Sequence, residues 1–224
     1  MSARTRHLTI GAAAAVALAC GDIGAPSRND FYEWRLIVPA AGGPDTVSFH
    51  WTRDRLPVRV WVAADEAPDL PAHVQHAIDT WEAAYLYGEY QAEIVSDSNA
   101  ADVIVRGVPA PLKAAARTTR MHSALAPECG GATDIDITPD LTQLRLPMRA
   151  YVDPRVSLDT PGLATCLSLT TIHELGHTIG IFAHSENPED IMYTDPQVEQ
   201  PSARDLGTAE VIYHLSPTIE VVGP

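Results

Sequence analysis

The segment at residues 170–193, TTIHELGHTIGIFAHSENPEDIMY, constrains the fold more than any other stretch of the chain. His173 and His177 are four residues apart, so on a helix they lie one turn apart on the same face. Residues 163–179 are mostly good helix formers and follow a Pro-Gly pair, which suits a helix start. We therefore predict a helix over 163–179 that directs both imidazoles to one place, with Glu174 beside them.

Two imidazoles on one helical face favour a metal ion, because imidazole is a common zinc ligand and a catalytic zinc site combines three protein ligands with one water. The stretch after the helix supplies His184 as the third candidate ligand. We expect His173, His177 and His184 to bind one catalytic Zn2+, which lowers the pKa of its bound water to about 7. Glu174 is then the general base that takes a proton from this water. Asp190 or a water is the alternative to His184 as third ligand.

These residues resemble a known clan of enzymes. HELGHTIGIFAHS is similar to the H-E-x-x-H-x-x-G-x-x-H signature of the metzincin zinc endopeptidases, and the serine after the last histidine is similar to the matrixin-like members. DIMY resembles the methionine turn of the clan, which implies that Met192 lies beneath the metal. Three residues separate Gly180 from His184, where the clan pattern has two, and we expect a local bulge to absorb the extra one.

The resemblance extends over about residues 56–215. It implies an α+β chain with a metzincin-like zincin fold, in which a twisted mixed β-sheet carries an active-site helix and a C-terminal helix. It also implies that a peptide substrate binds extended along an edge strand, for which residues 101–108 are the candidate. No pattern in this chain matches the structural calcium or second zinc sites of the family.

Apolar periodicity supplies the remaining elements. Helical spacing predicts helices at residues 71–85 and 202–215. Residues 31–38 and 45–51 flank PAAGGP, which predicts a hairpin with a Gly/Pro turn. Alternating or β-branched runs predict strands at 56–63, 91–97, 101–108, 133–138 and 149–153.

The first residues have the pattern of a targeting segment. Basic residues precede a short apolar run, so we interpret residues 1–19 as a signal peptide; the run is too short to span a membrane. ALAC, ending at Cys20, resembles a bacterial lipoprotein box, so we expect an exported protein that is lipid-anchored to the cell envelope, with plain secretion as the alternative. Residues 20–55 then form a tether and an N-terminal hairpin extension, and 56–224 form the catalytic domain.

The other two cysteines support export. If Cys20 carries lipid, Cys129 and Cys166 remain as an even pair in an oxidising compartment, which predicts a disulfide between them. Two free buried thiols are the alternative.

The charge balance bears on partners. The chain has 15 basic and 29 acidic residues and a formal net charge of −14, which disfavours nucleic acid as a partner. We therefore expect an exported zinc-dependent endopeptidase that acts on protein or peptide substrates. The alternatives are a catalytically inactive surface binding lipoprotein of the same fold and a zinc hydrolase that does not act on peptides.

Overall fold

The chain folds as a mixed α+β structure around one multistranded sheet. The computed structural model describes residues 30–40, 43–112, 118–122 and 127–222. The predicted signal peptide at 1–19 and the predicted lipidation site Cys20 lie outside these residues. Among the described helices, none is both long and apolar enough to cross a membrane.

The elements have the following bounds. The strands are β1 (Leu36–Ala40), β2 (Gly43–Val47), β3 (Val58–Val62), β4 (Ala92–Val95), β5 (Val103–Arg106), β6 (Thr118–His122), β7 (Cys129–Ile137), β8 (Gln143–Pro154) and β9 (Glu220–Val222). The helices are α2 (Leu70–Glu82), α3 (Leu163–Thr178) and α4 (Ala203–His214), with short 3-10 turns at Arg53–Arg55 and Ser98–Ala100.

Within the described residues, β3 to β9 form a seven-stranded sheet in the order β4-β3-β5-β8-β7-β6, with β9 paired to β8. Strands β4, β3, β5 and β8 are parallel, whereas β7 and β6 add in antiparallel fashion. Residues 101–108 do contain a strand, β5, but the prediction that this strand lies at the edge of the sheet was wrong. It lies in the middle of the sheet, between β3 and β8. Val103 and Val105 are buried there, and a β-branched run is typical of a central parallel strand.

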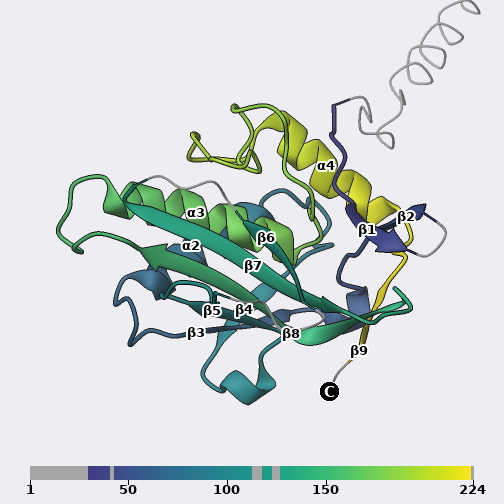
Figure 1. Cartoon of the computed structure of the whole chain (residues 1–224), viewed down its shortest axis with the longest axis horizontal. Coiled ribbons are helices and arrows are strands. Elements are labelled where there is room, and N and C mark those ends of the chain that lie inside the picture. Colours follow the sequence, from purple (N-terminus) through teal and green to yellow (C-terminus); the bar gives the residue numbers. More distant parts are fainter. Residues whose placement is uncertain (1–29, 41–42, 113–117, 123–126, 223–224) are drawn as a thin grey trace, which may run out of the picture.

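Helices α2 and α3 cover one face of the sheet, and α4 lies beyond α3 (Figure 1). Helix α3 packs on β7 and β8, and α2 packs on α3, where the indole nitrogen of Trp81 donates to the carbonyl oxygen of Ile172 at 2.8 Å. Helix α4 begins with a capping box, in which Ser202 and Asp205 satisfy each other's backbone N–H groups. Each of the three helices lies within a few residues of its predicted range.

The residues before β3 belong to the same core as the rest of the chain. Strands β1 and β2 pair as an antiparallel hairpin whose arms are shorter than the predicted 31–38 and 45–51. The hairpin and the chain on either side of it bury apolar side chains in the same core as the residues that follow. These side chains are Tyr32, Trp34, Val38, Val47, Phe49 and Trp51.

Candidate metal centre

Three histidine side chains converge at one point between α3 and the loop that follows it. His173 and His177 project from the helix, His184 comes from the loop, and one ligand atom from each lies within 4.8 Å of the others. The Nε2 atoms of all three are buried and have no hydrogen-bond partner among the described residues. Buried polar atoms normally find partners, so three orphaned lone pairs at one point fit a metal ion.

The other ring nitrogens of the two helical histidines are held by the backbone. The Nδ1 of His173 is 2.8 Å from the carbonyl oxygen of Ile191, and the Nδ1 of His177 is 2.6 Å from that of Ile181. A carbonyl can only accept, so each Nδ1 carries the proton and each Nε2 presents its lone pair to the centre.

Burial keeps these imidazoles in the neutral form that a metal requires. Desolvation, helped by the neighbouring His184, lowers the pKa of His173 to about 3. Desolvation also lowers the pKa of His177 well below its ordinary value, and that of His184 in the same direction. Metal binding to this set therefore need not displace protons from the rings near neutral pH.

The extra residue before His184 is absorbed by an irregular stretch. Helix α3 has ended at Thr178, and Gly180 turns the chain with a φ of +115°, a conformation that favours glycine. A Cβ on Gly180 would also lie 2.1 Å from the carbonyl oxygen of Phe49. The chain then has room to bring His184 back to the helix face despite the three intervening residues.

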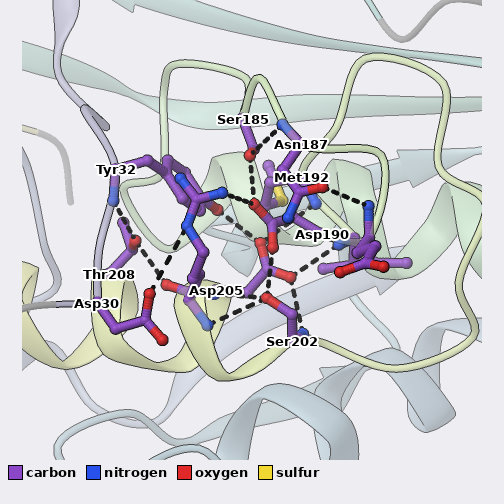
Figure 2. A network of polar contacts seen from close by, with 12 residues as sticks. Asp30, Tyr32, Ser185, Asn187, Asp190, Met192, Ser202, Asp205 and Thr208 are labelled. Atoms are coloured by element: carbon purple, nitrogen blue, oxygen red, sulfur yellow. Dashed lines mark hydrogen bonds and ion pairs between the residues drawn. The ribbon is translucent and has the colours of Figure 1, made fainter.

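Asp190, the alternative third ligand, has a different place. It is buried, and its carboxylate accepts hydrogen bonds from Ser185 and, at 2.6 Å, from Ser202. Arg204 adds an ion pair at 3.1 Å (Figure 2). Both oxygens of Asp190 thus have partners in a structural network, and it is not part of the converging group.

Glu174 follows His173 in α3, is fully buried, and is hydrogen-bonded to a residue of the sheet. Its Oε2 accepts a 2.6 Å hydrogen bond from the hydroxyl of Thr133 on β7. A Cβ on Gly131, two residues earlier, would lie 2.2 Å from the Oε1 of Glu174, so the strand backbone approaches the carboxylate closely. Neither residue was predicted as part of the site, although a glycine pair inside a strand is a known sign of close approach.

Met192 lies against helix α3 at Gly176. A Cβ on Gly176 would be 2.3 Å from the Sδ of Met192, so only glycine allows this contact. Asp205 of α4 holds the turn, because its carboxylate accepts from the backbone N–H of Ile191 at 2.7 Å and of Met192 at 3.4 Å (Figure 2). Met192 therefore packs on the turn of α3 that carries His177.

Cys129 and Cys166 are joined by a disulfide with a Cα–Cα distance of 6.0 Å. The bridge ties the start of β7 to the first half of α3, about two helical turns before Glu174. It also forms part of the wall of a cavity of about 360 Å3, together with Leu169, Thr170 and Asp195. The cavity therefore lies along the first half of α3, and its lining reaches as far as Thr170.

Known proteins do not add to this description: no family model matches the chain, and a search of curated proteins gives no match. The class of protein is therefore defined by the structure, as a mixed α+β protein with a buried three-histidine centre that can hold a metal ion.

Proposed function

We propose that this chain is an exported zinc endopeptidase with a metzincin-like, matrixin-like catalytic fold. The observation that carries the proposal is the convergence of three orphaned, neutral imidazole nitrogens next to a buried glutamate. Three imidazoles suit zinc and leave a coordination position for substrate or water. The sheet, helix α3 and the packing of Met192 on Gly176 support the metzincin-like assignment.

Zinc, when bound by His173, His177 and His184, supplies Lewis-acid activation of the attacking water and of the peptide carbonyl. Glu174 accepts the proton of that water on its carboxylate and delivers it to the nitrogen of the leaving amine. The hydroxyl of Thr133 fixes one carboxylate oxygen, so the base keeps one orientation through both transfers.

Export is supported by two features. The basic and apolar pattern of residues 1–19 is typical of a signal peptide, and Cys20 follows it in a lipoprotein-like context. The disulfide between Cys129 and Cys166 is stable in an oxidising compartment. The substrate is accordingly a protein or peptide met outside the cytoplasm, by an enzyme that is anchored through Cys20 or secreted.

The test uses the purified full chain. We expect about one zinc per chain, casein cleavage that stops on chelation and returns with zinc, and a loss of about 100-fold or more in Glu174→Gln with zinc retained. A wild-type chain that binds zinc, cleaves no member of a protein and peptide panel and matches Glu174→Gln in every assay would overturn the enzymatic assignment. A binding protein of the same fold would then be the better description.

A further inference from the structure

The segment from residue 30 to residue 51, with 41–42 outside the described residues, crosses the loop that carries the third histidine. We call this segment the N-terminal strap. Trp34 of the strap and Phe182 of the loop are 148 residues apart in the sequence (182 minus 34) but lie beside each other in the fold. Its contacts fall on the stretch that contains the extra residue.

The backbone of the strap fixes the path of the loop. The carbonyl oxygen of Trp34 accepts two hydrogen bonds, from the N–H of Phe182 at 2.8 Å and from that of Ala183 at 2.9 Å. These N–H groups belong to two of the three residues between Gly180 and His184. The backbone N–H of Ala183, which precedes His184, is thus bonded to the strap.

Aromatic side chains of the strap also pack against the loop. The ring of Phe182 is buried and stacks on Phe49, with centroids 6.2 Å apart and planes at 10°. Phe49 packs edge-on against Trp51, whose indole nitrogen donates to the carbonyl oxygen of Thr178 at 2.9 Å. The strap therefore makes hydrogen bonds and ring contacts with the chain from Thr178, at the end of α3, to Ala183, before His184.

The first residues of the strap contact helix α4. The hydroxyl of Tyr32 donates to Asp205 at 2.7 Å, and the backbone N–H of Tyr32 donates to Thr208 at 3.2 Å (Figure 2). Asp205 is the carboxylate that holds the turn at Met192. Both segments that surround the histidines are thereby tied to the same strap.

We infer that the N-terminal strap is a permanent part of the metal centre and positions His184 through Phe49, Trp34 and Phe182. Its removal disrupts the centre and does not uncover it. The inference rests on the metal assignment of the proposed function. Metal affinity is the readout, so a chain that binds metal but fails in proteolysis would overturn the proposed function and leave this test in force.

The test is a double-mutant cycle in the full chain, with Co2+ as the probe, followed by its visible absorption and by competition with a chelator. Phe49→Ala should weaken Co2+ binding about 10- to 100-fold, the usual effect of removing support behind a ligand. In a His184→Ala background the same change should have no further effect, because the strap then has no ligand to position. Ile37→Ala is the matched control, since that strap side chain is 64% exposed.

Two results would overturn the inference. One is wild-type Co2+ affinity in Phe49→Ala. The other is an equal loss in both backgrounds, which would show that Phe49 acts only on general stability. Phe49→Leu, which keeps an apolar side chain but loses the flat ring, is measured in parallel and decides the question if Phe49→Ala does not fold. A wild-type chain that binds no Co2+ would overturn the metal assignment and this inference together.

Discussion

Gly131→Ala should remove most activity while leaving the metal in place. A Cβ at this position would lie 2.2 Å from the Oε1 of Glu174 and 2.7 Å from Thr170, whereas ordinary contacts begin at 3.4 Å. The carboxylate must therefore move by about 1 Å, and a misplacement of that size costs a reaction about 100-fold. This corresponds to about 2.7 kcal/mol in the activation free energy.

The assay compares kcat on a peptide substrate with zinc content for each purified variant. Gly107→Ala is the matched control, because its Cβ would clash at 2.8 Å with the Cβ of Ala67, and its nearest atoms belong to Ala67 and Glu66, not to Glu174. We expect this control to lose stability but to keep the kcat of its folded fraction. Wild-type kcat in Gly131→Ala would refute the reasoning. Loss of zinc in that variant would also contradict it, because the clash would then extend beyond Glu174.

Three further predictions concern a hydrogen bond, the disulfide and a buried tyrosine. Thr133→Val should lower kcat about 10- to 100-fold with little change in KM, because a hydrogen bond to the charged Glu174 contributes about 1.5–3 kcal/mol. Thr133→Ser keeps the hydroxyl and should keep most activity. Replacing Cys129 and Cys166 by serine frees a loop of 37 residues and should lower the free energy of unfolding by about 4 kcal/mol in denaturant titrations; an unchanged midpoint would contradict this. Burial raises the pKa of Tyr90 above its ordinary value of 10.0, so the folding free energy contributed by its neutral form is complete below pH 10.0 and is lost as the pH rises further. In a pH titration, tyrosinate absorbance and far-UV circular dichroism should change together.

Local patterns in the sequence were enough to predict the helices and the meeting of the histidines. His173 and His177 are held together by helical geometry alone, and His184 is only seven residues further along, so few conformations separate them. The same holds for α4, whose capping residue Ser202 stands at its predicted start. Interactions of this kind are encoded within one or two turns of chain.

Contacts across the sheet could not be predicted in the same way. Thr133 meets Glu174 over 41 residues, and no local pattern records that pairing. The position of residues 101–108 was misassigned for the same reason, since strand order depends on which partner pairs on each side. The role of Trp34 was equally hidden, because it acts through a main-chain carbonyl that every residue possesses.

The long reach of the strap also bears on how the protein is made. Tyr32 and Asp205 are 173 residues apart, and Trp51 and Thr178 are 127 apart. Closing such long loops is entropically costly and slow, so these pairings are expected to come late in folding. Asp205 is therefore synthesised long after Tyr32, its partner in the strap. A nascent chain that has not yet reached Asp205 cannot make the hydrogen bond from Tyr32, so the segments around the histidines are fixed only after that residue has been synthesised.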